Sequence, residues 1–476
     1  MIAPICRLFF AKICLLLTAL FVAGSCHAAF YMPDNLAKTP AELSYRNALQ
    51  SVLADLARQR SALLNIQREL VSRPGINPAY GGDGEEPKAR WIEEWLADEG
   101  LPPAERVDFP DQKVPSKIRP NLILRYPAEF APDRQTLWTF CYLDNYIAGN
   151  PAVWSGSPFA LRVDGDLFYG KGVQDNNDGI AAALLLYRAL HNHESIIPVN
   201  FGIIMLSGEK ELNGVGFDHV IAQRPGLLKK TDHYFIISYG GEDGDLIGVG
   251  EKALMWLKIT LNGKQTHSGM SDTSKNSLVA GADLIMRLGQ LYDLFPAVNS
   301  LFEQPTSTFI PTKPEAPETA SNQVPGEFAF HLDTRILSEY HPDQIYEAVE
   351  KLAAPIAEKY GVGIDVKRYM LSLPAPITDA ETPVVLALSN AIEAQLGRKA
   401  RLYGVGGVSL ASNLRRAGYP TAVWQMAPMV ANAPDEFMSV SANLAEAAIM
   451  ARLVFDPALA IPAPDLNADS GVETGQ

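Results

Sequence analysis

The sequence predicts an α/β fold with a largely parallel β-sheet, into which a smaller α+β domain is inserted. Short β-rich runs alternate with helical patterns in the first half of the chain, as in parallel sheets covered by helices. After Glu251 strands and helices of a different spacing replace this alternation, and the first pattern resumes at Pro383. A chain of 476 residues has room for two or three domains.

The main domain is expected to begin with one long helix over residues 41–70, along which leucine and valine recur at helical spacing. Further helices are expected over residues 89–99 and 179–191. The β-rich runs between these helices predict buried strands of the parallel sheet. We expect those strands at residues 122–126, 137–143, 199–206 and 234–238.

The inserted α+β domain is expected to span residues 256–373, between two parts of the main domain at 45–255 and 375–455. Its first strand is indicated by the alternation of apolar and polar residues after Glu251. Residues 456–476 are rich in Pro, Ala and Asp and are expected to form a disordered tail. Within the insertion we expect strands at 254–261, 326–335 and 362–370, and helices at 277–295 and 341–360.

Composition and charge exclude several classes of protein. Apolar residues make up 47% of the chain, which is typical of a globular protein. The chain has 40 Lys and Arg against 54 Asp and Glu, which gives a formal charge of −14. An acidic surface repels phosphate backbones, so no nucleic-acid partner is expected. The mean hydropathy is near zero, which excludes a protein with many membrane spans.

The N-terminus predicts a cleaved signal peptide over residues 1–28, and hence a periplasmic or secreted protein. Two basic residues precede an apolar run of about a dozen residues, which is too short to span a bilayer comfortably. A lipoprotein signal that ends at Cys26 is the alternative. Three of the four cysteines lie in this segment, so the mature chain keeps only Cys141. We expect Cys141 to be a buried core thiol.

Four segments carry motifs that together point to one known family. Each motif is weak alone, but their order, their spacing and the inserted domain agree with that family over residues 45–455. The segments are Tyr142-Leu143-Asp144 with Tyr169-Gly170-Lys171-Gly172-Val173-Gln174-Asp175, then Ser207 to Gly216, then Gly263-Lys264-Gln265-Thr266-His267-Ser268, and Ala431-Asn432-Ala433-Pro434-Asp435-Glu436. The sequence resembles the M20 metallohydrolases, the family of succinyl-diaminopimelate desuccinylase and aminoacylase.

This resemblance implies a zinc-exopeptidase-like core, a ferredoxin-like inserted lid, and a possible homodimer through residues 256–373. The family hydrolyses amide bonds in peptides or N-acyl amino acids, with two zinc ions that activate a bridging water. Two of the family's zinc ligands are retained as Asp175 and Glu211. The family's Asp that orients a ligand imidazole corresponds to Asp144. A family histidine that reaches toward the substrate carbonyl corresponds to His267.

The remaining positions of the family's site are substituted in this sequence. The two ligand histidines correspond to Tyr142 and Asn432. The fourth ligand corresponds to Tyr239, or Glu242 takes its place. The general base, a Glu in the family, corresponds to Lys210, or to Glu209 if the alignment shifts by one residue; the motif spacing favours Lys210. An ammonium does not take a proton from zinc-bound water, but it can neutralise carboxylates that converge without metal.

The distribution of histidine excludes a simple misalignment. None of the eight histidines lies between residues 28 and 190, and none lies beyond residue 341. We therefore expect a metal-free binding protein or pseudoenzyme without a cofactor, whose ligand is a small peptide or resembles an acyl-amino acid. One alternative is an active metallohydrolase with a reduced or single zinc centre on Asp175 and Glu211. A third hypothesis is a metal-free chemistry that uses Lys210 with Tyr142 or Tyr239.

Overall fold

The computed structural model describes residues 39–211, 214–273, 275–428 and 430–460. The expected signal peptide at residues 1–28 lies outside these ranges, as does most of the expected tail. The described chain ends in a 3₁₀-helix, Pro457–Ala460, in which Leu459 is buried. The first residues of the expected tail are therefore folded. None of the described helices has an apolar stretch long enough to cross a membrane.

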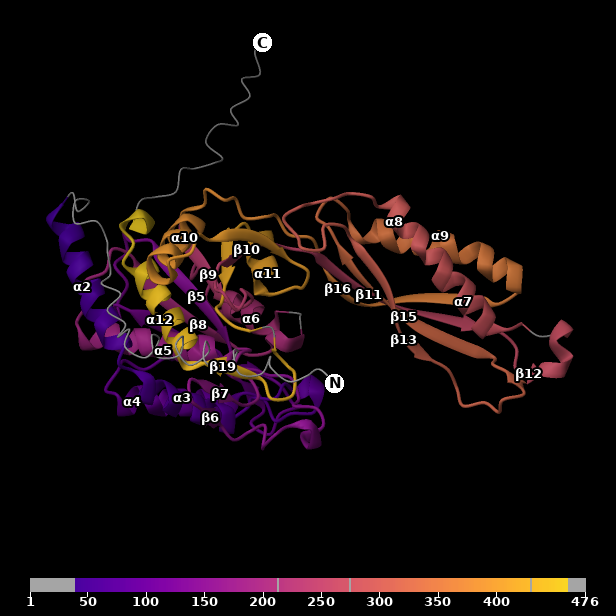
Figure 1. Cartoon of the computed structure of the whole chain (residues 1–476), viewed down its shortest axis with the longest axis horizontal. Helices are drawn as coiled ribbons and strands as arrows, with labels where there is room; N and C mark the ends of the chain where they lie inside the picture. The colour runs from indigo at the N-terminus through magenta and orange to yellow at the C-terminus, as the bar shows by residue number, and fades with distance from the viewer. Residues whose placement is uncertain (1–38, 212–213, 274, 429, 461–476) are drawn as a thin grey trace, which may run out of the picture. The chain divides into compact units, whose positions relative to one another are not determined.

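An eight-stranded β-sheet carries the candidate site (Figure 1). From edge to edge its strands are β1 (Glu105–Arg106), β4 (Leu122–Tyr126), β8 (Asn200–Leu206), β5 (Thr136–Tyr142), β9 (His233–Ile237), β18 (Thr421–Trp424), β10 (Leu246–Glu251) and β17 (Arg401–Val405). Four of the seven strand pairs are parallel: β8–β5, β5–β9, β9–β18 and β10–β17. The other three pairs are antiparallel. The predicted α/β fold with a largely parallel sheet is confirmed.

Helices pack on both faces of this sheet, because its central strands are apolar on both sides. Along β5, Cys141 belongs to one apolar cluster, while Phe140 and Tyr142 belong to the other. Cys141 is buried and not part of a disulfide, as expected. The Cys141 face is covered by α3 (Arg60–Ser72), α4 (Glu86–Asp98), α5 (Asn177–Asn192), α10 (Pro383–Leu396) and α12 (Val440–Val454). The Tyr142 face is covered by α6 (Val215–Gln223) and α11 (Leu410–Arg416).

The N-terminal helical region differs from the prediction. Instead of one helix over residues 41–70, the structure has α2 (Pro40–Leu56) and a separate α3 that begins at Arg60. Gln59 leaves helical geometry between them, and its side chain bonds with Asp55 and Arg188. The buried leucine and valine residues of both helices keep their helical spacing. Sequence periodicity therefore located the apolar face but not the break.

A separate four-stranded antiparallel sheet, in the order β13-β15-β11-β16, lies within the segment expected to be inserted. Its helices and strands enclose their own apolar cluster. The expected helix over residues 277–295 is divided by a 3₁₀ turn into two helices. The elements are β11 (Ala253–Asn262), α7 (Ser277–Arg287), α8 (Leu291–Leu294), β13 (Thr308–Glu315), β15 (Glu327–Ile336), α9 (Pro342–Tyr360) and β16 (Gly363–Ser372).

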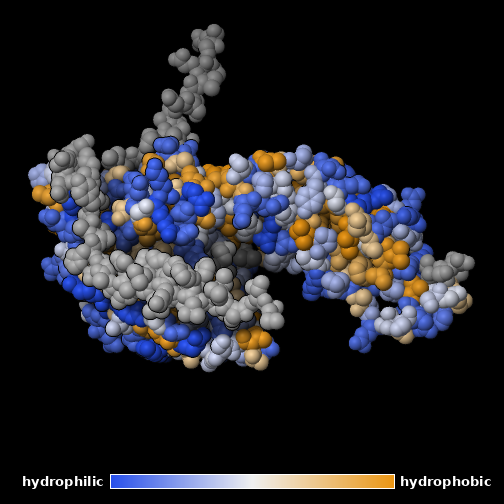
Figure 2. Space-filling model, in the orientation of Figure 1, coloured by the Kyte–Doolittle hydropathy of each residue, from blue (hydrophilic) through white to orange (hydrophobic). Residues whose placement is uncertain are grey.

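Apolar side chains gather on the exposed surface of α7 (Figure 2). Leu278, Val279 and Met286 are the exposed large apolar residues of this helix. A homodimer through residues 256–373 stays a prediction, as does the division of the chain into domains.

Three small sheets complete the fold. One of them, β19-β7-β6, holds residues near 436 beside residues near 170, and Gly170 donates a backbone hydrogen bond to the Glu436 carbonyl at 3.0 Å. This contact brings two of the sequence motifs together. The strands of the small sheets are β2 (Phe109–Pro110), β3 (Ile118–Arg119), β6 (Arg162–Asp164), β7 (Leu167–Tyr169), β12 (Thr266–His267), β14 (Gln323–Val324) and β19 (Phe437–Ser439).

The close approach of the chain after β9 to the chain after β18 predicts a sensitive position. A Cβ atom at Gly240 would lie 1.6 Å from the Gln425 carbonyl oxygen. We expect Gly240→Ala to lower the free energy of unfolding by about 1–3 kcal/mol, since backbone must move to admit the methyl group. Urea denaturation measures this loss. Gly156→Ala is the control, because no atom lies within 4 Å of its Cβ position; equal stability of the two variants would contradict the described packing.

Candidate functional site

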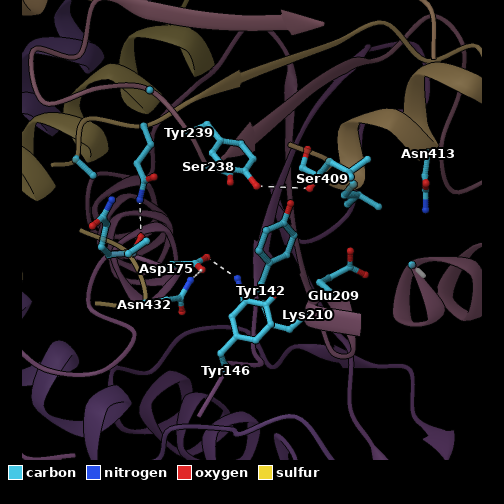
Figure 3. A pocket seen from close by; sticks show the side chains of 18 of the residues that line it. Tyr142, Tyr146, Asp175, Glu209, Lys210, Ser238, Tyr239, Ser409, Asn413 and Asn432 are labelled. Atoms are coloured by element: carbon cyan, nitrogen blue, oxygen red, sulfur yellow. Dashed lines mark hydrogen bonds and ion pairs between the residues drawn. The ribbon is translucent and has the colours of Figure 1, made fainter. Parts of the chain in front are cut away.

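The ends of neighbouring strands surround a cavity of about 310 Å³ (Figure 3). Carboxyl ends of parallel strands meet at one edge of a sheet, which is where α/β proteins bind ligands. β5 ends at Tyr142, β8 is followed by Lys210, β9 by Tyr239 and β18 by Gln425. All four of these residues line the cavity, together with Asp175 from the turn before α5. The sheet thus brings distant parts of the sequence to one place.

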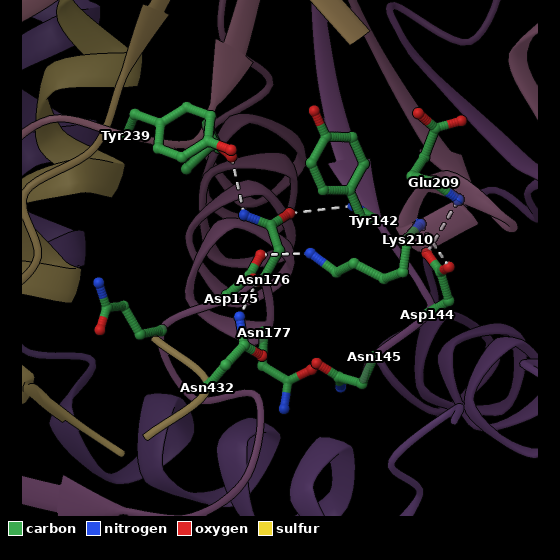
Figure 4. Close-up of polar contacts among 12 residues, drawn as sticks. Tyr142, Asp144, Asn145, Asp175, Asn176, Asn177, Glu209, Lys210, Tyr239 and Asn432 are labelled. Carbon is green, nitrogen blue, oxygen red and sulfur yellow. Dashed lines mark hydrogen bonds and ion pairs between the residues drawn. The ribbon is translucent and has the colours of Figure 1, made fainter. Parts of the chain in front are cut away.

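An ion pair between Lys210 and Asp175 lies in the wall of the cavity (Figure 4). The Lys210 side chain is 8% exposed and the Asp175 side chain 21%. Burial alone would lower the pKa of Lys210, but the charges of Asp175 and Asp144 outweigh burial and raise that pKa. Burial alone would raise the pKa of Asp175, but Lys210 outweighs it and lowers that pKa. Both groups are therefore charged at neutral pH.

The backbone at Lys210 is fixed by Asp144. This carboxylate is fully buried and accepts hydrogen bonds from the backbone N–H groups of Glu209 at 3.2 Å and Lys210 at 2.8 Å. It also accepts one from the side-chain amide of Asn77 at 2.8 Å. The expected role of Asp144 in orienting a ligand imidazole stays a prediction. Its contacts in this structure position the 3₁₀ turn Glu209–Glu211.

A second lysine holds Asn432 in place on the other side of Asp175. Lys171 Nζ donates to Asn432 Oδ1 at 2.6 Å and pairs with Glu436 at 3.0 Å, and both charged side chains are buried. The Asn432 side-chain amide in turn donates to Asp175 Oδ2 at 3.3 Å. The backbone of Asn432 is left-handed, with φ of 63°. Neutral Asn432 thus has protein partners for both its oxygen and its nitrogen.

Three tyrosine rings form the aromatic part of the wall. Lys210 Nζ lies 5.2 Å from the ring centroid of Tyr142 and 5.7 Å from that of Tyr146, which is cation–π distance. Burial raises the pKa of Tyr142 and of Tyr239, and raises that of Tyr146 to about 12. All three phenols are therefore neutral at ordinary pH. Neutral phenols are poor zinc ligands.

Glu209 is a site residue that the motif comparison did not select. It lines the cavity, is 8% exposed, and has one carboxyl oxygen without a hydrogen-bond partner among the described residues. Burial, with the nearby charge of Asp144, raises the pKa of Glu209 to about 8. The signal in the sequence was the shifted alignment, which places Glu209 at the general-base position. That one of its carboxyl oxygens lacks a partner among the described residues depends on tertiary packing, which the sequence does not show.

Four residues considered from the sequence are not among those that line the cavity: Asp144, described above, and Glu211, His267 and Glu242. Glu211 accepts a hydrogen bond from Arg119 Nη1 at 2.8 Å, and Arg119 is also held by buried Glu85. His267 is exposed, and its ring contacts Asn322 and the backbone of Gly269, both within the second sheet's segment. Glu242 is likewise absent from the lining. The catalytic and metal-binding roles assigned to these positions stay predictions.

Sequence comparison identifies the family. The profile of peptidase family M20/M25/M40 matches residues 146–456, about two thirds of the chain. The chain belongs to this family. The M20 assignment expected from the motifs is therefore confirmed, and with it a metallohydrolase ancestry.

Relatives and solved structures agree with M20 membership. An uncharacterized metallohydrolase of Methanocaldococcus jannaschii is 27% identical over 79% of this chain and 95% of the relative. A succinyl-diaminopimelate desuccinylase of Methylococcus capsulatus is 26% identical over 73% of this chain and 86% of the relative. Human carnosine dipeptidase 1 shares the fold with a TM-score of 0.70 at 14% identity, over 87% of this chain and 98% of that one.

The side chains at the cavity do not fit the paired zinc ions that M20 resemblance implies. In the described ranges, no group of three or more His, Cys, Asp and Glu side chains is arranged to hold a metal ion. Asp175 is engaged by an ammonium, and Glu211 by a guanidinium. The two positions expected to lack histidine carry a buried phenol and a hydrogen-bonded amide.

The Lys210–Asp175 pair can be tested by a double-mutant cycle. Lys210→Met leaves Asp175 without its cation, and we expect a loss of about 3 kcal/mol in unfolding free energy. Lys210→Met with Asp175→Asn removes both charges and should recover much of that loss. Urea denaturation of each variant measures the coupling. Lys351→Met is the control, because its pair with Glu347 is exposed and should contribute about 0.5 kcal/mol or less.

Buried Lys88, which donates to Asn177 at 3.0 Å, predicts a pH dependence of stability. Burial lowers the pKa of Lys88 to about 7. Between this value and the unfolded value of about 10.5 the unfolded chain binds more protons, so stability rises with pH. The slope should reach about 1.4 kcal/mol per pH unit. Urea denaturation from pH 7 upward measures the slope of unfolding free energy against pH. We expect this slope to disappear in Lys88→Met and to persist in the control Lys399→Met, a change at an exposed lysine.

Proposed function

We propose that this M20 protein is a metal-free binding protein that holds a small peptide-like or acyl-amino-acid-like ligand without hydrolysing it. The observation that carries the proposal is the Lys210–Asp175 ion pair in the wall of the cavity. By resemblance, Lys210 stands where the family has its general base and Asp175 where it has a bridging ligand. Asp175, at a retained zinc-ligand position, and Lys210, at the position of the general base, thus neutralise each other's charge.

Electrostatics supports this proposal. A divalent ion about 4 Å from an ammonium is repelled by several kcal/mol at an effective dielectric constant near 20, twice the value for two unit charges. The raised pKa of Lys210 keeps that ammonium protonated. Loss of the supporting hydrogen bonds around a metal site already weakens binding about 10–100-fold. Replacement of the two histidines that bind zinc in the family by Tyr142 and Asn432 should weaken zinc binding further.

The proposal keeps the cavity as a binding site, although hydrolysis is lost. Its volume of about 310 Å³ is at the lower end of the range for small-molecule sites. Its lining combines aromatic rings with hydroxyl, amide and charged groups, as ligand sites do. Export through residues 1–28 stays a prediction from the sequence, and it would place such a binding protein in the periplasm or outside the cell.

Metal analysis tests the proposal. Protein purified without chelator should contain well under one zinc per chain by elemental mass spectrometry, and should not cleave dipeptides or acyl-amino acids. Zinc added to the protein should not change its thermal unfolding temperature, because no ligand set is available to bind it. Stoichiometric zinc together with chelator-sensitive hydrolysis would instead establish a divergent metallohydrolase.

Reversal of the substitutions provides a matched positive control. Lys210→Glu alone should not restore zinc binding, because both histidines remain absent. Tyr142→His, Lys210→Glu, Tyr239→Asp and Asn432→His together should raise the zinc content above that of the unchanged protein. If Lys210→Glu alone restored full zinc occupancy, the assignment of the histidine positions would be wrong.

A further inference from the structure

Two buried polar atoms in the cavity wall have no hydrogen-bond partner among the described residues. They are the phenol oxygen of Tyr142 and Oε1 of Glu209. The two residues are only 5% and 8% exposed. Buried polar groups in native proteins are almost always bonded, so each exception calls for an explanation. Both residues line the same cavity, and Figure 3 shows the Tyr142 hydroxyl pointing into it, toward Tyr239 and Ser409.

The charges in the wall restrict the kind of molecule that can reach these two atoms. Three acidic or basic side chains line the cavity: Asp175, Glu209 and Lys210. Glu209 is mainly protonated at neutral pH, because burial and the charge of Asp144 raise its pKa to about 8. Lys210 and Asp175 already neutralise each other. A carboxylate on the ligand would meet the like charge of Asp175, which is costly, and it would find no free cation among the described lining residues because Lys210 already pairs with Asp175. A cationic group would meet the ammonium of Lys210, which already lies against two tyrosine rings.

The rest of the lining is made of uncharged hydrogen-bonding groups and aromatic rings. These groups can bond to amides and hydroxyls, and their rings can pack against apolar atoms of the same ligand. No further cation or anion among the lining residues is available to pair with a charged ligand. The polar members are Tyr146, Gln174, Ser238, Tyr239, Ser372, Ser409, Asn413, Gln425 and Asn432.

We propose that the cavity binds an uncharged group whose adjacent donor and acceptor atoms complete the hydrogen bonding of Tyr142 and Glu209. A primary amide and a pair of vicinal hydroxyls share this chemistry. The inference rests on the proposed function, since it is the metal-free cavity that leaves both atoms to the ligand. The inference restricts the class of ligands proposed above, because the part of the ligand that reaches Tyr142 carries no free carboxylate.

Binding of matched probes to the full chain tests the inference. The probes are N-acetylglycinamide, its carboxylate counterpart N-acetylglycine, and glucose, each followed by ligand-observed NMR at neutral pH. We expect the amide, glucose or both to bind at least about tenfold more tightly than the carboxylate. Comparison of the amide with glucose shows whether the cavity binds a primary amide or a pair of vicinal hydroxyls. Equal or tighter binding of N-acetylglycine, or no binding of either uncharged probe, would overturn the inference.

Two variants test whether binding of the uncharged probe depends on the Tyr142 hydroxyl and on the carboxyl group of Glu209. Tyr142→Phe removes one hydroxyl and should weaken the uncharged probe about tenfold, the loss expected for one buried hydrogen bond. Glu209→Leu removes the carboxyl group, with the oxygen that lacks a partner among the described residues, at similar volume, and should also weaken binding of the uncharged probe. Tyr346→Phe is the control, because that hydroxyl donates to the Val366 carbonyl in the second sheet's segment. An unchanged affinity for the uncharged probe in Glu209→Leu would overturn the role of Glu209.

The two proposals fail on different measurements. Stoichiometric zinc would overturn the metal-free function, whatever the probes show. Zinc-free protein that binds N-acetylglycine as tightly as its amide would overturn this inference alone. Circular dichroism of each variant shows whether a loss of binding reflects unfolding. If Tyr142→Phe unfolds, the affinity measured in Glu209→Leu still decides the inference.

Discussion

The ion pair of Lys210 with Asp175 is the interaction on which the site depends. Three carboxylates near one edge of a sheet repel each other in a medium of low polarity, so they need a cation close by. Lys210 provides one within the chain, and Arg119 provides another for Glu211. Asp144 holds the backbone that carries Lys210, and Lys171 orients the amide that completes Asp175. The fixed charges of the site are balanced by the protein itself.

The parallel strands explain why these groups meet at all. β5, β8, β9 and β18 end at the same edge, so each chain segment that follows a strand contributes to one cavity. The small sheet of β19 with β7 adds the loop that carries Asn432. A relative in this family is named a succinyl-diaminopimelate desuccinylase, and a protein that shares the fold is named a carnosine dipeptidase. A fold provides positions for side chains and does not fix the reaction.

Much of the architecture was predictable because it depends on local sequence. The strands β4, β5, β8 and β9 agree with the predicted runs to within a residue or two, since a strand buried on both faces is a short apolar run whatever surrounds it. The expectation that β4 is parallel was wrong, because β4 is antiparallel to both of its neighbours. The break between α2 and α3 was not predictable, because the helical spacing of apolar residues continues through it. The residues named from the M20 motifs included most of the charged and aromatic groups around Asp175, although Glu211 and His267 do not line the cavity.

By itself, the sequence determined the α/β class, the M20 family, and the identity of the groups at the motif positions. Those features follow from residue type and spacing along the chain. Only the tertiary structure decided that Lys210 pairs with Asp175 and that Arg119 engages Glu211. It also decided that Tyr142 and Glu209, which line one cavity, each have a polar atom without a partner in the described part of the chain. Each of these facts depends on where separate strands end relative to one another. Partner choice among buried charges is a matter of distance and burial, and neither quantity is written in the order of the residues.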